Sequence, residues 1–143
     1  MIFLEKPENF DDSLEVAGCA IQCKGKLLFL HRQDHKPQGN TWDMPSGKIK
    51  KGESVVSGLV REISEETGLI FKEENLEFFR KVYVKYPDLD FVYHIFSTEL
   101  SEQPDVKIDL KSHKAFTWVT PEEALKMPLI PDEDKCIKLY FNL

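Results

Sequence analysis

The stretch GKIKKGESVVSGLVREISEETGL, residues 47–69, decides how the rest of this chain is interpreted. Residues 54–67 have helical periodicity, yet Glu62, Glu65 and Glu66 crowd near the end of that helix. At about 100° of rotation per residue, the three carboxylates share one face of the helix. Carboxylates in the last turns oppose the helix dipole, and like charges at this spacing repel one another. Helix stability alone therefore does not account for the cluster.

The apolar side chains of this helix form a separate stripe suited to a protein core, made of Val56, Leu59, Val60 and Ile63. Gly58 lies on the acidic face, where glycine costs about 0.5 to 1 kcal/mol relative to alanine. We therefore expect a close approach by backbone or ligand at Gly58. A solvated surface, with Arg61 offsetting part of the repulsion, is the alternative interpretation of the acidic face.

The spacing outside the helix favours a functional interpretation. From Gly47 to Leu69 the sequence resembles the Nudix box at every defining position. That box is Gly, five residues, Glu, seven residues, Arg-Glu, an aliphatic residue, one residue, Glu-Glu, one residue, Gly and an aliphatic residue. The resemblance covers most of the chain from about Val16, including Trp118-Val119 before a short helix. Ser46 departs from the family, whose members usually carry glycine there.

Short apolar runs separated by turn residues predict a mixed strand and helix organisation. The expected strands span residues 16–23, 27–31, 41–44, 76–86, 91–100 and 115–119, and the expected helices span 54–67, a short one from 120, and 132–141. Lys24-Gly25 is expected to form a tight hairpin turn. The resemblance implies an α/β Nudix fold, an α/β/α sandwich with a mixed central β-sheet, in one domain over residues 1–143.

Composition restricts the class of protein. The chain of 143 residues is 41% hydrophobic and 31% charged, which is typical of a soluble globular protein. A net charge of -6 without a basic cluster argues against nucleic-acid binding. No signal peptide or membrane span is visible, so a cytoplasmic location is expected. Cys19, Cys23 and Cys136 lack metal-type spacing and are expected to be reduced thiols.

The resemblance implies a metal-dependent active site. Glu62, Glu65 and Glu66 would bind divalent ions, and the carbonyl oxygen of Gly47 would add a ligand. Such an oxygen-rich set suits Mg²⁺ or Mn²⁺ better than zinc. The implied catalytic residues are Glu53, Arg61, Glu62 and Glu65, with Arg61 holding carboxylates by bidentate hydrogen bonds.

The general base and the substrate contacts are less defined by the resemblance. Candidates for the base are Glu53 and Glu65 inside the box and Glu99, Glu102 and His113 outside it. The candidate substrate-binding residues are Trp42, Phe91, Tyr93 and Asp132. Alternation along a strand also makes Phe91 and Tyr93 core candidates. Asp132 follows a proline and has two expected roles. It would either face the base, as the base-reading loop does in MutT-like enzymes, or cap the terminal helix.

The leading hypothesis is a Mg²⁺-dependent, MutT-like pyrophosphohydrolase that converts an oxidised purine nucleoside triphosphate to a monophosphate and pyrophosphate. Dinucleoside polyphosphates are one alternative, because Lys81, Tyr83, Lys85 and Tyr86 suit a long polyphosphate. ADP-ribose is less favoured, because only about fifteen residues precede the first expected strand. A non-catalytic Nudix domain that binds a nucleotide or a protein is the alternative of another class. The expected partner is a nucleotide, without nucleic acid or membrane, and the expected state is a monomer or homodimer.

Overall fold

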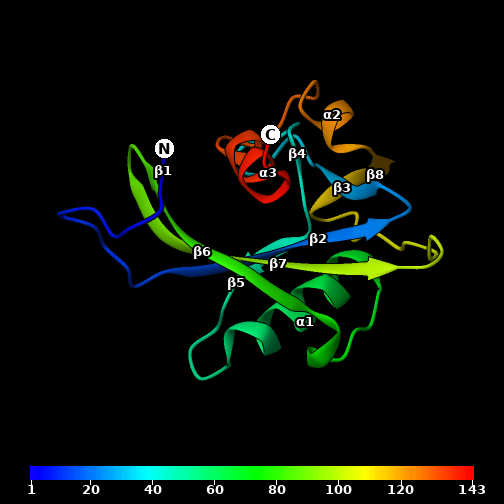
Figure 1. Ribbon diagram of the computed structural model, residues 1–143, viewed down its shortest axis with the longest axis horizontal. Helices are drawn as coiled ribbons and strands as arrows, with labels where there is room; N and C mark the ends of the chain where they lie inside the picture. Colours follow the sequence, from blue (N-terminus) through cyan, green and yellow to red (C-terminus); the bar gives the residue numbers. More distant parts are fainter.

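The computed structural model describes residues 1–143 and contains one eight-stranded mixed sheet with helices on both faces (Figure 1). The strand order is β1-β6-β7-β2-β3-β4, while β5 pairs with β2 and β8 pairs with β3. The elements are β1 (Ile2–Phe3), β2 (Glu15–Cys23), β3 (Lys26–Arg32), β4 (Trp42–Asp43), β5 (Ser46–Lys48), α1 (Val55–Thr67), the 3₁₀ helix η1 (Glu73–Asn75), β6 (Glu77–Tyr86), β7 (Leu89–Leu100), β8 (His113–Val119), α2 (Pro121–Ala124) and α3 (Glu133–Phe141). The predicted α/β/α arrangement is confirmed.

The strand β2 lies at the centre of the sheet and has an edge shared by two neighbours. One edge pairs in parallel with β7 along its whole length, from Glu15 opposite Val92 to Cys23 opposite Leu100. The other edge pairs with β5 at its beginning and with β3 only at its end. Because β3 and β5 leave β2 in different directions, the sheet splits there, as Figure 1 shows.

The helix α1 covers one face of the sheet (Figure 1) and has a defined beginning and end. The Ser54 hydroxyl accepts a hydrogen bond from the Ser57 amide at 3.2 Å, which caps the first turn. Gly68 ends the helix with a φ of 74°, a left-handed conformation that glycine adopts without strain. Leu59 and Ile63 are fully buried against β2 and β3, so the predicted apolar stripe is confirmed.

The helices α2 and α3 pack on the opposite face of the sheet (Figure 1). Thr120 and Glu123 form the predicted capping box at the start of α2. Buried Ile137 of α3 packs with Phe29 of β3, while Cys136 packs with the β6–β7 pair. The residue before α3 therefore reaches the region where the sheet splits.

Several local details differ from the sequence prediction. The strands β1 and β5 were not predicted, because both are short and their pairing depends on backbone partners in β6 and β2. The connection between β6 and β7 is shorter than predicted, since β7 begins at Leu89. Lys24 and Gly25 have φ values of 50° and 80°, which confirms the predicted hairpin turn. The three cysteines are free and buried, and no helix has the length and apolar character of a transmembrane segment.

We expect Ile63→Ala to lower the free energy of unfolding by about 2 to 5 kcal/mol, because the fully buried side chain fills the core beneath α1. Denaturant titration monitored by circular dichroism measures this loss. Ile70→Ala is the matched control, because Ile70 is 86% exposed and its loss should change stability by no more than about 0.5 kcal/mol. Equal effects of the two substitutions would contradict the assignment of the core.

Candidate active site

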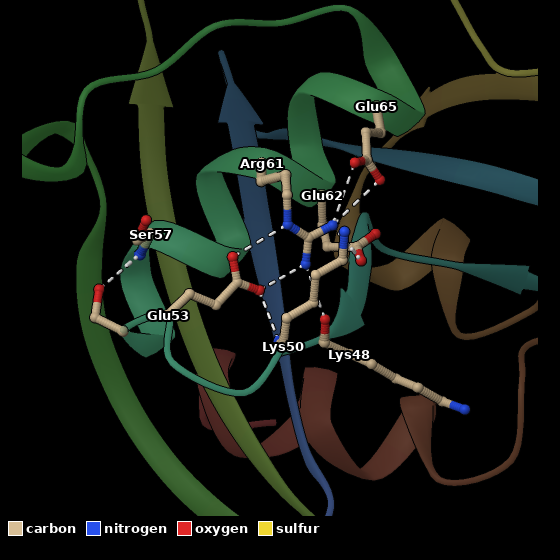
Figure 2. A network of polar contacts seen from close by, with 8 residues as sticks. Lys48, Lys50, Glu53, Ser57, Arg61, Glu62 and Glu65 are labelled. Atoms are coloured by element: carbon tan, nitrogen blue, oxygen red, sulfur yellow. Dashed lines mark hydrogen bonds and ion pairs between the residues drawn. The ribbon is translucent and has the colours of Figure 1, made fainter.

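The Arg61 guanidinium joins the loop before α1 to the carboxylates on the helix (Figure 2). Two of its nitrogens contact the two oxygens of Glu53, at 2.7 and 3.2 Å. It also lies 3.0 Å from Glu62 and 3.3 Å from Glu65, and it donates to the Lys48 carbonyl at 3.1 Å. The predicted bidentate hydrogen bonds of Arg61 are therefore present, and they are made to Glu53.

Glu53 is the most strongly held carboxylate of this group. Besides its two contacts with Arg61, its Oε1 accepts a hydrogen bond from the Lys50 amide at 2.7 Å. The hydrogen bonds from Arg61 and Lys50 lower the pKa of Glu53 to about 2. A carboxylate with this pKa is a poor proton acceptor near neutral pH, so its position favours a structural role over that of a general base.

Gly58 allows the loop to lie close to the helix. A Cβ atom at this position would lie 2.7 Å from Ile49 Cδ1 and 2.8 Å from Glu53 Oε1. The expected close approach at Gly58 is therefore made by side chains of the preceding loop. Since Glu53 is held by Arg61, a larger residue at position 58 would disturb that ion pair.

Glu62 and Glu66 face the other way and line a cavity of about 430 Å³, together with Gly47. A Cβ atom on Gly47 would overlap the Glu62 carboxyl group, so a larger residue there would displace that side chain. The Ser46 amide donates to Glu66 Oε1 at 3.0 Å, and Ser46 needs no left-handed backbone conformation. Serine is thus compatible with this position of the loop.

Burial opposes the ionisation of both cavity carboxylates. Desolvation raises the pKa of Glu62, and desolvation together with the charge of Asp43 raises the pKa of Glu66 well above its usual range. The single guanidinium of Arg61 contacts Glu53, Glu62 and Glu65 but not Glu66. The four glutamates therefore carry more negative charge than Arg61 alone can compensate.

A hard divalent cation fits this donor set, because the nearby groups are carboxylate and carbonyl oxygens. The structure brings only part of the predicted ligand set to the cavity: Glu62, Glu66 and Gly47 line it, while Glu65 is 54% exposed and pairs with Arg61. No three acidic, histidine or cysteine side chains have metal-binding geometry here. To bind a cation together with Glu62 and Glu66, Glu65 would have to break its ion pair with Arg61.

Aromatic and apolar side chains also line the cavity. The rings of Tyr86 and Phe91 meet edge to face with centroids 5.4 Å apart, and Phe91 lies 6.4 Å from Tyr93. Tyr93 is only 7% exposed and packs over Gly18, while Tyr86 donates to the Pro131 carbonyl at 2.9 Å. Phe91 and Tyr93 therefore both line the cavity, and Tyr93 also belongs to the core.

Three buried polar side chains line the same cavity, and each has atoms without a hydrogen-bond partner: Asp43, His113 and Glu133. They are 5%, 1% and 6% exposed, respectively. Asp43 lies 3.6 Å from Arg32 Nη1 through one oxygen and 3.4 Å from His113 Nε2 through the other. Buried polar groups are usually paired, so these groups are suited to contact a ligand.

Asp132 and Trp42 are placed differently from one another. Asp132 occupies the N-cap position of α3 with a φ of 70°, but its side chain makes no capping hydrogen bond. It lines the cavity and contacts Lys135 Nζ at 2.9 Å and the Met1 amino group. The Trp42 ring stacks on His31 and packs against the core behind β4, so the structure does not favour a substrate contact by Trp42.

The candidates for a general base outside the box are also separated by the fold. His113 lines the cavity, while Glu99 lines a different hollow and Glu102 lies on the surface. Sequence analysis did not identify Asp43 or Glu133 as site residues. Asp43 follows a tryptophan in a two-residue strand, and Glu133 resembles an ordinary acidic residue in a first helical turn, so neither carries a local signal.

Comparison with known proteins agrees with this geometry. The NUDIX domain family matches residues 13–140. CTP pyrophosphohydrolase from Escherichia coli (strain K12) is 30% identical over 132 residues, which are 91% of this chain and 93% of that protein. An 8-oxo-dGTP diphosphatase from Buchnera aphidicola is 35% identical over 71 residues, 50% of this chain and 54% of that protein. The MutT protein of Methanosarcina mazei Go1 has a TM-score of 0.76 at 24% identity, over 90% of this chain and 92% of that one.

The fold and these relatives define a hydrolase that acts on pyrophosphate bonds. The chain belongs to the Nudix family.

The pH dependence of stability should reveal the buried carboxyl of Glu133. Burial, and then the charge of Asp43, raise its pKa from 4.5 to about 8. The folded protein therefore binds this proton more tightly than the unfolded chain. The resulting stabilisation is complete below about pH 4.5 and is lost as pH rises through about 8.

We expect Glu133→Gln to remove part of the fall in unfolding free energy between pH 5 and pH 8.5, by a few kcal/mol, at about 1.4 kcal/mol per pKa unit. Denaturant titrations of both proteins at several pH values measure the difference. The raised pKa values of Glu62 and Glu66 affect the pH dependence of unfolding free energy in the same way in both proteins. Their contribution therefore cancels in the comparison. Parallel pH profiles would contradict a raised pKa at Glu133.

Proposed function

We propose that this protein hydrolyses a nucleoside triphosphate to a nucleoside monophosphate and pyrophosphate, with Mg²⁺ or Mn²⁺ bound at the Nudix box. One observation carries the proposal: a single cavity is lined by Glu62 and Glu66 and also by aromatic side chains and unpartnered polar groups. A volume of about 430 Å³ suits a small molecule. The carboxylates suit phosphates held through a cation, and the aromatic side chains suit a base.

Glu62, Glu65, Glu66 and the Gly47 carbonyl would hold the divalent cation, which supplies a Lewis acid for phosphate oxygens and lowers the pKa of a water. Arg61 and Glu53 act by position, because their ion pair fixes the loop against α1. Ser46 keeps the Glu66 carboxylate directed by its backbone amide. Glu65 is proposed to break its ion pair with Arg61 and to bind the cation instead. It also remains a candidate for the general base.

The aromatic wall is proposed to hold the base. Phe91 and Tyr93 offer ring faces or edges, and the apolar wall excludes water from the base. Asp132 and Glu133 line the same cavity, so they are the proposed polar contacts. The carboxylate of Asp132 remains ionised at neutral pH: burial opposes this, but hydrogen bonds from the Met1 amino group and Lys135 lower its pKa.

Two kinds of base are candidates. The resemblance to MutT-like enzymes and the similarity to an 8-oxo-dGTP diphosphatase support an oxidised purine. The similarity to CTP pyrophosphohydrolase over 91% of this chain supports cytosine as the second candidate. Each kind of substrate would give a nucleoside monophosphate and pyrophosphate, so the proposed chemistry is common to both.

The other predicted activities have less geometric support. Lys85 pairs with Asp90, and neither Lys81 nor Tyr83 lines the cavity, so most of the side chains predicted to bind a long polyphosphate do not support that role. A purely binding role leaves the repulsion among the buried box carboxylates without compensation. Dinucleoside polyphosphates and ADP-ribose therefore serve as comparison substrates in the test.

We expect Glu66→Gln and Glu65→Gln to lower turnover by at least about 100-fold, because each removes one carboxylate ligand of the proposed cation. Turnover is followed as pyrophosphate release with saturating Mg²⁺, and circular dichroism checks the fold. Glu74→Gln is the matched control, because Glu74 is exposed in η1 and lies outside both the box and the cavity. Unchanged turnover in both box variants would refute the metal assignment.

A substrate panel tests the reaction itself. With Mg²⁺ we expect hydrolysis of CTP, 8-oxo-dGTP or both, giving a monophosphate and pyrophosphate, and we expect chelation of the metal by EDTA to abolish it. Chromatography of the products identifies the bond that is cleaved. Cleavage of ADP-ribose or a dinucleoside tetraphosphate, with all triphosphates left intact, would overturn the proposed function.

A further inference from the structure

We propose that the free edge of β6 is a dimerisation surface, on which a second copy of this chain pairs its own β6 in the antiparallel direction. This dimer is independent of the proposed reaction, because none of residues 77–81 lines the cavity. The partner is a second copy of the chain because the charges along this edge are complementary to the same charges in reverse order.

The first half of β6 is an unpaired edge of the sheet. One side of β6 pairs with β7 along its whole length, whereas the other side pairs only with β1, at Tyr83 and Val84. The five residues at the start of the strand, Glu77 to Lys81, are all exposed. Their outward backbone N–H and C=O groups have no partner strand, and an edge of this kind can pair with a strand from another chain.

Two phenylalanine rings lie uncovered along this edge. Phe78 is 53% exposed and Phe79 is 37% exposed. The Phe78 ring meets Phe96 of β7 with centroids 5.4 Å apart, while the Phe79 ring meets Tyr140 of α3 at 4.9 Å. The two rings lie on opposite faces of the sheet, because Phe96 belongs to the core beneath α1 and α3 covers the other face. A second strand at this edge would cover both rings, and aromatic contacts between neighbouring strands stabilise a sheet.

An irregularity in β6 determines which charged side chains share a face. The register between β6 and β7 shifts between Phe78 and Arg80, so Glu77 lies opposite Ser97 and Arg80 lies opposite Ile95. Ser97 and Ile95 are two residues apart on β7, so their side chains point to the same face of the sheet. Directly opposite residues also share a face. Because Ile95 packs with α3, both Glu77 and Arg80 lie on the face that α3 covers.

This order of charges makes the edge complementary to itself. When two copies of β6 run antiparallel about a two-fold axis between Phe78 and Phe79, Glu77 of each copy lies opposite Arg80 of the other. Neither residue makes an ion pair within its own chain, and nor does Glu99, which lines the same polar hollow as Glu77. Like charges on an edge strand prevent pairing, but opposite charges that face each other favour it.

The test measures molecular mass by size-exclusion chromatography with light scattering. Wild type should have twice the 16.6 kDa mass of one chain. Glu77→Arg and Arg80→Glu should each lower the association constant by at least about 100-fold, because each substitution places like charges opposite one another twice in the two-fold dimer. An equal mixture of the two variants should form a heterodimer, since every arginine at this edge then faces a glutamate.

Lys111→Glu is the matched control, because Lys111 is exposed in the segment before β8 and undergoes the same change of charge as Arg80→Glu. Circular dichroism and thermal melting verify that each variant folds. A wild type that stays monomeric up to its limit of solubility would overturn the proposal, as would a dimer that survives both single substitutions or a mixture that does not associate. These measurements use no substrate, so failure to cleave any triphosphate would refute the proposed function and leave the dimer unaffected.

Discussion

The contacts of the Arg61 guanidinium are the constraint on which the rest of the site depends. Glu62 and Glu65 repel one another in the later turns of α1, where the helix dipole also opposes them, and Glu53 approaches from the loop before the helix. Arg61 compensates three of these charges at once and, through the Lys48 carbonyl, holds the strand before the loop. Arg61 makes no ion pair with Glu66, whose carboxyl group lines the cavity. This supports the proposed binding of a divalent cation there.

The splitting of the sheet beside β2 gives the proposed cation site its location. β5 places Gly47 against Glu62, while the paired strands β3 and β4 carry Arg32 and Asp43 to the same cavity. The start of α3 closes the cavity with Glu133. The split of the sheet thus brings the box glutamates and the aromatic side chains together around one cavity. Buried side-chain atoms of Asp43, His113 and Glu133 are left without partners in this cavity.

The sequence predicts the local parts of this structure well, and the parts that depend on tertiary contacts poorly. The periodicity of Leu59 and Ile63 and the spacing of the box glutamates are local patterns, so the helix and its acidic face could be predicted. The group of Asp43, His113 and Glu133 could not, because the three residues come from β4, β8 and α3 and meet only after folding. Trp42 is a predicted substrate contact, but its partly buried ring stacks on His31 and is not among the side chains that line the cavity. Asp132 occupies the predicted N-cap position while its side chain serves other contacts.

The parallel pairing of β2 with β7 also affects the order in which parts of this protein fold. It joins Glu15 to Val92 and Cys23 to Leu100, so most of the chain must be present before the central strands can align. Closing so long a loop costs entropy before any contact is gained, and such pairings form slowly. The Nudix loop and α1 need only residues close in sequence, whereas the base wall needs β4, β7 and α3 together. We therefore expect the carboxylate cluster to assemble early and the selectivity of the pocket to arise last, when the chain completes its longest-range contact.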